Sequence, residues 1–210
     1  MDNKYAEVMN LLLEVLKDNK SGNEIPVGIS NRHIHLSQAD LDALFGAGYE
    51  LTKMKDLSQP GQYACKETVT VVGPKGAIEK VRILGPVRKA TQIEVIAGDS
   101  FKLGVAGDVR MSGDLAGTHG VTLVGPKGSV QTKEGLIVAQ RHIHMTLADA
   151  ARLGVKDGDI VDIKVTGSRG GIFSNVAIRA NDSSALECHI DTEEANAMGL
   201  TSKSTITIVK

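Results

Sequence analysis

The segment Arg-His-Ile-His occurs twice in the chain, at residues 32–35 and at residues 141–144. These two segments hold four of the six histidines. Alternate residues of a β-strand point to the same side, so the two histidines of each segment would present their imidazoles together, while the isoleucine between them points into a core. Neutral imidazoles are common ligands of zinc and related divalent metal ions. The repeated segment therefore predicts metal-binding chemistry.

Each segment opens a longer match, because RHIHLSQADLDALFG (32–46) is similar to RHIHMTLADAARLG (141–154). In both copies a hydroxyl residue follows the histidine strand, Ser37 in the first and Thr146 in the second. Such a residue can cap a helix, and the aspartate three residues later completes a pattern like a capping box. We therefore expect a strand followed directly by a short helix in each copy.

The same unit recurs more faintly at two other places. The spacing between a residue able to bind metal and a glycine is ten residues in three copies, from His144 to Gly154, from His189 to Gly199 and from Glu94 to Gly104. In the fourth copy His35 precedes Gly46 by eleven residues. Glycine commonly ends a helix. We infer four related strand–helix units, paired into two halves.

The rest of the chain is rich in short apolar segments joined by glycine and proline turns. VTVVGPKG (69–76) returns as VTLVGPKG (121–128), and the 23 glycines suit tight turns between strands. We predict a mainly β fold with short α-helices, consisting of two small β-barrels capped by helices and built from internal repeats. The expected short helices are residues 37–46, 99–103, 146–153 and 192–198. The expected division is an N-terminal amphipathic helix and linker at 1–22, a first barrel half at 23–115 and a second at 116–210.

The repeat assigns equivalent strand ends to six candidate metal ligands, which are His33, His35, Glu94, His142, His144 and His189. Six ligands exceed the need of one tetrahedral zinc ion. They suit two divalent ions with three protein ligands each, zinc first and then cobalt, nickel, manganese or iron. His119 lies outside the repeat and is expected at the surface, and Cys65 and Cys188 are expected in the core.

Composition excludes several classes of function. The net charge is −1 without a block of like charges, so no nucleic-acid surface is expected. No apolar run approaches 18 residues, and no basic stretch precedes an apolar one at the N-terminus, so neither a membrane span nor a secretory signal is expected. The two cysteines suit a reducing compartment, and we expect a cytoplasmic protein.

Several segments together resemble the phosphate propanoyltransferases of the PduL type. The segments are SNRHIHLS, QPGQYACKETVTVVGPKG, VRILGPVRKATQIEV, IVAQRHIHM and LECHIDTEEANA. The resemblance runs from about residue 25 to the C-terminus, and the doubled histidine motif is its most specific part. It implies two β-barrels with a two-metal site between them, usually zinc. It also implies transfer of an acyl group between coenzyme A and inorganic phosphate.

The resemblance further implies roles for individual residues. The six candidate ligands would hold the metals, and Arg88 would contact phosphate. The coenzyme A surface would include Ser30, Lys55, Arg82 and Asn196. Residues 1–20 resemble the encapsulation tags that direct such enzymes into bacterial microcompartments, where shell or core proteins would be the partners.

Whether the chain forms a homo-oligomer is left open. Two other functions fit parts of the sequence pattern. One is a metal-dependent hydrolase of a thioester or amide, since His-X-His also opens barrel amidohydrolases. That scaffold needs about 250 residues with long alternating helices. The other is a non-catalytic metal-binding module of a microcompartment.

Overall fold

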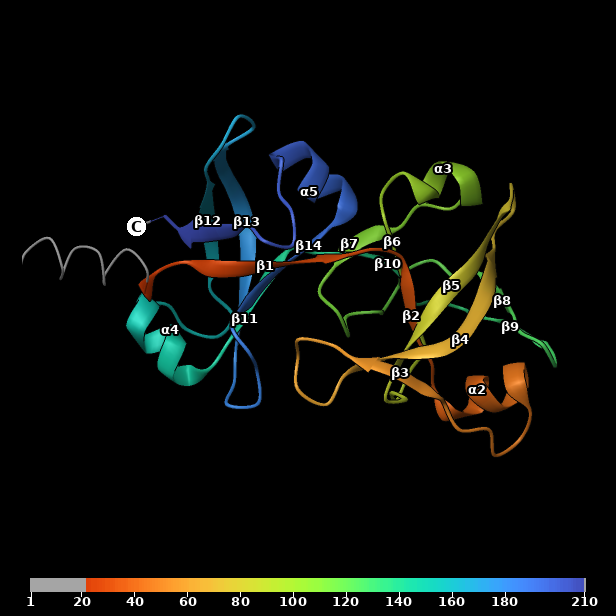
Figure 1. The fold of residues 1–210 in the computed structure, drawn as a ribbon. Helices are drawn as coiled ribbons and strands as arrows, with labels where there is room; N and C mark the ends of the chain where they lie inside the picture. Colours follow the sequence, from red (N-terminus) through yellow and green to blue (C-terminus); the bar gives the residue numbers. More distant parts are fainter. Residues whose placement is uncertain (1–21, 210) are drawn as a thin grey trace, which may run out of the picture.

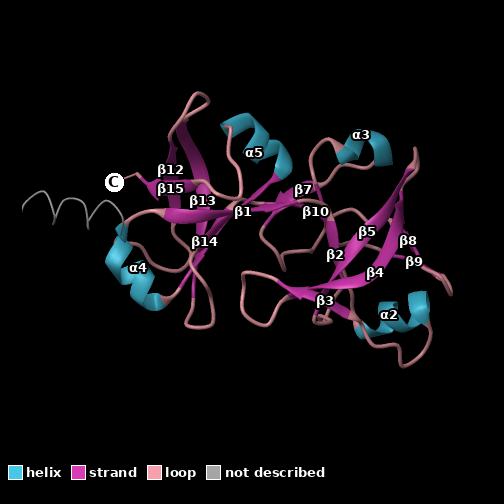
Figure 2. Ribbon diagram, in the orientation of Figure 1, coloured by secondary structure: helices cyan, strands magenta, loops and turns pink. Residues whose placement is uncertain are grey.

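The computed structural model describes residues 22–209, which form two lobes side by side (Figure 1). The helix expected within residues 1–22 falls almost wholly outside the described residues. Short helices lie around strands in both lobes (Figure 2), so the predicted mainly β fold with short helices is confirmed. One predicted barrel closes fully, whereas the other is an open, half-barrel sheet.

The barrel lobe is a closed ring of six strands in the order β1-β14-β11-β13-β12-β15. Its elements are β1 (Ile25–Ser30), β11 (His142–Met145), α4 (Leu147–Leu153), β12 (Ile160–Val165), β13 (Gly171–Ala180), β14 (Glu187–Asp191), α5 (Thr192–Met198) and β15 (Thr205–Ile208).

The open-sheet lobe contains nine strands, with β3 paired to β4 beside the path β7-β10-β6-β2-β5-β4-β8-β9. Its elements are β2 (His33–His35), α2 (Gln38–Phe45), β3 (Lys53–Asp56), β4 (Tyr63–Val72), β5 (Ala77–Gly85), β6 (Gln92–Val95), α3 (Asp99–Leu103), β7 (Asp108–Arg110), β8 (Thr122–Val124), β9 (Ser129–Gln131) and β10 (Leu136–Ala139).

A unit of five strands occurs in both lobes with the same order and directions. In the open-sheet lobe the order is β10-β6-β2-β5-β4, and in the barrel lobe it is β1-β14-β11-β13-β12. The pairings along each unit are parallel, antiparallel, parallel and antiparallel in turn. The register also matches, because His33 lies opposite Glu94 and His142 lies opposite His189. The four strand–helix units inferred from sequence are therefore a structural repeat.

Relative to a division at residues 115 and 116, the two lobes exchange strands, because β1 lies in the barrel lobe and β8, β9 and β10 lie in the open-sheet lobe. Strand β1 precedes β2 in the chain but pairs with β14 and β15 of the barrel lobe. Strand β10 precedes β11 but pairs with β6 and β7 of the open-sheet lobe, which also holds β8 and β9. The chain therefore crosses between lobes twice, once before each histidine strand (Figure 1).

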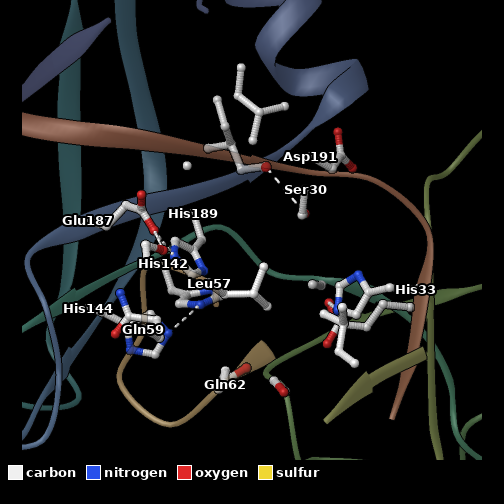
Figure 3. Close-up of a pocket in the computed structure, with 18 of the residues that line it drawn as sticks. Ser30, His33, Leu57, Gln59, Gln62, His142, His144, Glu187, His189 and Asp191 are labelled. Carbon is white, nitrogen blue, oxygen red and sulfur yellow. Dashed lines mark hydrogen bonds and ion pairs between the residues drawn. The ribbon is translucent and has the colours of Figure 1, made fainter. Parts of the chain in front are cut away.

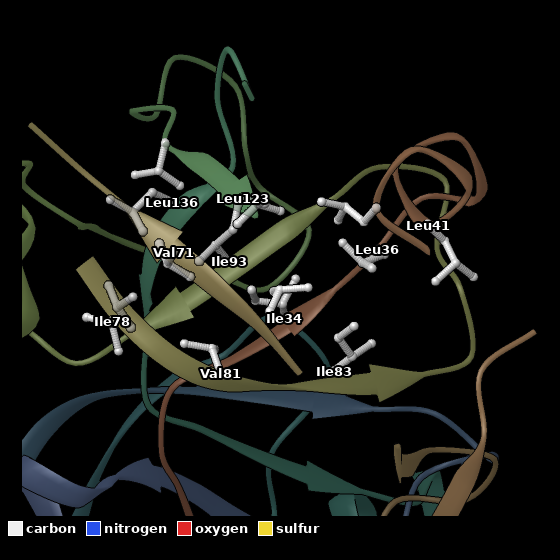
Figure 4. Close-up of a cluster of buried hydrophobic side chains, with 14 of the residues drawn as sticks. Ile34, Leu36, Leu41, Val71, Ile78, Val81, Ile83, Ile93, Leu123 and Leu136 are labelled. Atoms are coloured by element: carbon white, nitrogen blue, oxygen red, sulfur yellow. The ribbon is translucent and has the colours of Figure 1, made fainter. Parts of the chain in front are cut away.

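Each lobe has its own apolar core built from aliphatic side chains. In the open-sheet lobe Ile34, Val71, Ile83, Ile93 and Leu136 meet between the curved strands (Figure 4). In the barrel lobe Ile143 and Cys188 belong to the equivalent cluster. The isoleucine between each histidine pair is fully buried, which fixes the histidines on the opposite face of the strand.

The helices begin and end at the residues that the sequence repeat predicts. Thr146 forms a full capping box with Asp149 at the start of α4, and Ser37 caps α2 through the backbone N–H of Asp40. Gly104, Gly154 and Gly199 end their helices in the left-handed conformation. Gly46, which follows its candidate ligand by eleven residues instead of ten, ends α2 at φ 109° and ψ 149°. Among the helices within residues 22–209, none is long and apolar enough to cross a membrane.

Candidate metal centre

The first group of candidate ligands gathers at the meeting of β2 and β6. One potential ligand atom from each of His33, His35 and Glu94 lies within 4.8 Å of the others. His33 Nε2 is 3.2 Å from Glu94 Oε2, across the antiparallel pairing that sets these residues opposite each other. His35 is almost fully buried. This group offers two imidazoles and one carboxylate.

The second group gathers at the equivalent place in the barrel lobe, where β11 meets β14. Its members, His142, His144 and His189, also have ligand atoms within 4.8 Å of one another. His142 Nε2 lies 3.2 Å from His144 Nε2, and the His189 ring centroid is 5.1 Å from that of His142. This group offers three imidazoles.

Both groups line one cavity of about 430 Å³ between the lobes. Figure 3 shows His142, His144 and His189 on one side of this cavity and His33 on the other, with Leu57 between them. Both His-X-His strands, which were expected to share one cleft, line this cavity. The six residues are therefore placed as two facing groups of three.

Backbone carbonyls orient one imidazole in each group. His33 Nδ1 lies 2.8 Å from the carbonyl oxygen of Asn31, and His142 Nδ1 lies 2.8 Å from that of Gln140. A carbonyl only accepts a hydrogen bond, so Nδ1 carries a proton in both residues, and Nε2 is the nitrogen left to bind metal. Both carbonyls belong to the segments that cross between lobes. The strand exchange thus fixes which nitrogen of each histidine can bind metal.

Burial sets the charge of most groups here. It lowers the pKa of His35 to about 3, and it lowers the pKa values of His142 and His144 to about 4 and about 3. Burial also opposes the charge of the pair formed by His33 and Glu94, but their mutual attraction is stronger. The pKa of His33 is therefore raised, and that of Glu94 is held far below its usual range. The neutral imidazoles of His35, His142 and His144 and the Glu94 carboxylate are in the forms that bind metals, whereas a protonated His33 would have to release a proton to bind one.

The donor sets fit divalent metal ions. Three nitrogens in one group, and two nitrogens with one carboxylate in the other, suit zinc and the borderline transition metals. Within residues 22–209, His35 Nδ1 and His144 Nδ1 are buried side-chain atoms that lack any hydrogen-bond partner. Buried polar atoms are rarely left in this state. One such atom in each group agrees with a place for an ion.

Arg88 lines the cavity. Its Nη1 donates to Ser112 Oγ over 3.1 Å, and its side chain is partly buried. Burial lowers the pKa of its guanidinium, Glu94 opposes this shift, and the positive charge of Arg179 adds to it. Arg179 also lines the cavity and was not predicted from sequence. Two guanidinium groups can together attract an anion into the space between the ligand groups.

The four residues assigned to coenzyme A by resemblance are not gathered together. Ser30 lines the cavity, and its Oγ donates to the backbone carbonyl of Ile190. Lys55 and Asn196 are exposed and lie outside the cavity lining. Arg82, also outside the lining, donates to the carbonyls of Cys65 and Lys66.

Residues outside the repeat largely follow the sequence interpretation. His119 is exposed, and Cys65 and Cys188 are free and fully buried. Two polar residues near the ligands were missed, Gln92 beside Glu94 and Glu187 beside His189. Each stands two positions before a candidate ligand, a spacing that would have revealed it.

Comparison with known proteins gives a consistent result. The family model described as phosphate propanoyltransferase matches residues 26–201. A curated phosphate propanoyltransferase of Rhodobacter capsulatus is 58% identical, over 89% of this chain and 86% of the relative. Those of Thermotoga maritima and Lachnoclostridium phytofermentans are 54% and 51% identical and cover 97% and 99% of both chains.

Proposed function

This chain belongs to the phosphate propanoyltransferase family, and we propose that it moves an acyl group from coenzyme A to inorganic phosphate, reversibly, at a two-metal site. Propanoyl-CoA is the proposed substrate, because the relatives carry that activity in their names. The observation that carries the site is the cavity lined by two groups of three metal-binding side chains.

The proposed metal ligands are the two groups as the fold presents them. His33, His35 and Glu94 would hold one ion, and His142, His144 and His189 would hold the other, with zinc the best match to these donors. Bound divalent ions would supply Lewis acidity, which stabilises negative charge on phosphate and on the reacting thioester.

The protein's own charges would place the phosphate. Arg88 can donate in a bidentate manner to phosphate oxygens while Ser112 steadies one of its nitrogens. Arg179 would add a second positive charge from the opposite lobe. Holding the dianion and the thioester together reduces the entropic part of the barrier by several kcal/mol.

The reaction needs no covalent intermediate on the enzyme. An oxygen of phosphate forms the new bond to the carbonyl carbon, the carbon–sulfur bond breaks, and coenzyme A leaves as a thiolate with the electron pair. Burial raises the pKa of the Cys188 thiol to about 12 and that of Cys65 to about 11, so neither is a competing nucleophile.

Further parts of the proposal concern binding and location. Ser30 would contact coenzyme A from within the cavity, and Lys55, Arg82 and Asn196 would contact its more distant parts. Residues 1–20 would serve as a tag for the shell or core proteins of a microcompartment in the cytoplasm, within propanediol degradation.

The test measures release of free thiol from propanoyl-CoA with and without phosphate. We expect release that requires phosphate and bound metal, with acyl phosphate as the product. His144→Ala should lose bound metal and activity together. His119→Ala is the matched control, because His119 is exposed and outside both groups.

Three outcomes would contradict the proposal. Full turnover after complete removal of metal would exclude the two-metal site. Thiol release without phosphate would instead indicate the hydrolase that the doubled histidine motif also allows. Absence of any thiol release by metal-loaded protein would favour the non-catalytic binding module.

A further inference from the structure

Two polar residues occupy the same position in the repeat of the two lobes. Gln92 stands two residues before Glu94 on β6, and Glu187 stands two residues before His189 on β14. Residues two apart on a strand point to the same side, so each lies next to a candidate ligand. The position is therefore the same in the two lobes, but its side chain is an amide in one and a carboxylate in the other.

Gln92 holds Glu94 through a network of hydrogen bonds. Its Nε2 lies 2.5 Å from Glu94 Oε1 and 2.8 Å from Ser112 Oγ, and its Oε1 accepts from the backbone N–H of Gly113 over 2.7 Å. Gln92 is 1% exposed. With Oε1 of Glu94 engaged, Oε2 faces His33. Through Ser112, the same network reaches Arg88.

Glu187 holds His189 in the corresponding way. Its Oε2 lies 2.6 Å from His189 Nε2 and also accepts from Ser58 Oγ, which belongs to the other lobe. A carboxylate only accepts, so His189 Nε2 carries the proton and the lone pair is on Nδ1. Carboxylates that fix a metal-binding histidine in this way are common partners of such ligands.

The backbone beside Glu187 makes room for its carboxylate. Gly28 lies in the interior of β1, opposite His189 in the parallel pairing. A Cβ atom at Gly28 would lie 2.6 Å from Glu187 Cδ. Glycine within a strand is unfavourable unless another group must approach closely. The glycine is therefore explained by the close approach of Glu187.

We propose that Gln92 and Glu187 are positioning residues with opposite polarity, one for each metal group. The amide of Gln92 donates to the ligand that is a carboxylate, and the carboxylate of Glu187 accepts from the ligand that is an imidazole. Each group then has one carboxylate beside it, Glu94 as a ligand in the first and Glu187 behind His189 in the second. The inference rests on the two-metal site proposed above.

The test measures zinc affinity of each group separately, against a competing chromogenic chelator. His35→Ala disables the first group, so that the remaining zinc reports on the second, and His144→Ala does the reverse. In the His35→Ala background we expect Glu187→Gln to weaken zinc binding about 10- to 100-fold and Gln92→Met to have little effect. In the His144→Ala background we expect Gln92→Met to weaken zinc binding and Glu187→Gln to have little effect.

Controls separate positioning from folding. Glu79→Gln and Gln131→Glu change exposed residues of β5 and β9 and should leave zinc affinity unchanged in both backgrounds. The melting temperature of the metal-free variants reports on folding. If Gln92→Met lowers the melting temperature, Ser112→Ala is tested instead in the His144→Ala background, because it loosens the same hydrogen-bond network.

The inference for Glu187 would be overturned if Glu187→Gln changed zinc affinity equally in both backgrounds or in neither. The inference for Gln92 would be overturned by the same results for Gln92→Met. A wild-type protein that binds fewer than two zinc ions would overturn the proposed two-metal site itself. The two failures are therefore distinguishable.

Discussion

Side chains around the cavity take their charge from burial and from one another. Burial keeps the imidazoles of His35 and His144, with pKa values of about 3, free of the proton that would block metal binding. Arg88 keeps its charge despite burial, because a guanidinium does not lose its proton in proteins. The cavity therefore combines neutral donors for cations with fixed positive charge for an anion.

Arg88→Ala should raise the KM for phosphate more than the KM for propanoyl-CoA. Loss of a hydrogen bond to a charged group costs about 1.5–3 kcal/mol, which corresponds to a change of about 10- to 100-fold. Steady-state kinetics with each substrate varied in turn would measure it. Arg110→Ala, on β7 and outside the cavity lining, is the control. A larger rise in the KM for propanoyl-CoA would argue against contact between Arg88 and phosphate.

The buried thiols predict a dependence of stability on alkaline pH. The pKa of Cys188 is about 12 in the folded protein and about 9 when the thiol is free, so ionisation above pH 9 favours the unfolded chain. The stabilisation is complete below pH 9 and is lost as pH rises toward 12. Urea unfolding between pH 9 and 11 should show a steeper loss for wild type than for Cys188→Ala. Equal slopes would contradict this.

At the scale of single residues, spacing in the sequence indicated where the candidate ligands lie, but not which side chains surround them. Strand periodicity placed each histidine pair on one face, because i and i+2 geometry is local, and the sequence repeat added Glu94 and His189. It could equally have identified Gln92 and Glu187, whose position was overlooked. Arg179 reaches the cavity through pairing of β13 with β11, a contact between distant segments that periodicity does not report.

A short helix follows each histidine strand, and its stability depends on the residues that cap its two ends. Helix α4 has seven residues, too few to be stable without packing and caps. The side chains of Thr146 and Asp149 each accept from the other's backbone N–H at its start, and Gly154 ends it in the left-handed conformation.

Thr146→Ala should lower the free energy of unfolding by about 1 kcal/mol, because it removes the side-chain cap of α4. Chemical denaturation followed by circular dichroism would measure the change. Thr166→Ala, an exposed threonine outside the named helices and strands, should change stability by less than about 0.5 kcal/mol. Equal effects of both substitutions would show that the cap contributes nothing.

The sequence predicted these helices closely because capping residues and glycines are local signals. The start of α2 differs in one respect. Thr91 stands between Ser37 and Asp40, accepting from the Ser37 backbone N–H and donating to the Asp40 carboxylate. This relay involves a residue over 50 positions away, and so local pattern could not predict it.

On the scale of the whole molecule, strand exchange joins the two lobes. Arg32 and Arg141 occupy the crossing segments, and each pairs with an acidic residue of a helix in the lobe it enters, Asp99 in one and Glu194 in the other. These two ion pairs fasten the crossing segments to the lobes they enter. The lobes are not continuous in sequence, because strand partners are set by nonlocal pairing.

Fragments 23–115 and 116–210 should each fail to fold when produced alone. The first lacks β10, which covers β6, and the second lacks β1, which covers β14 and closes the barrel. Amide chemical-shift dispersion in two-dimensional NMR spectra would test this. A dispersed spectrum from either fragment would show that the exchanged strand is dispensable. The intact chain should unfold in a single transition.

The crossing strands also bear on how such a chain could have arisen. A half-length ancestor with one copy of the five-strand unit would have lacked a neighbour for its leading strand unless a twin supplied it. Reciprocal donation between two identical copies would have satisfied both and brought two ligand triads face to face. Fusion of two such genes end to end would leave the connectivity seen here, with each half still completed by the other.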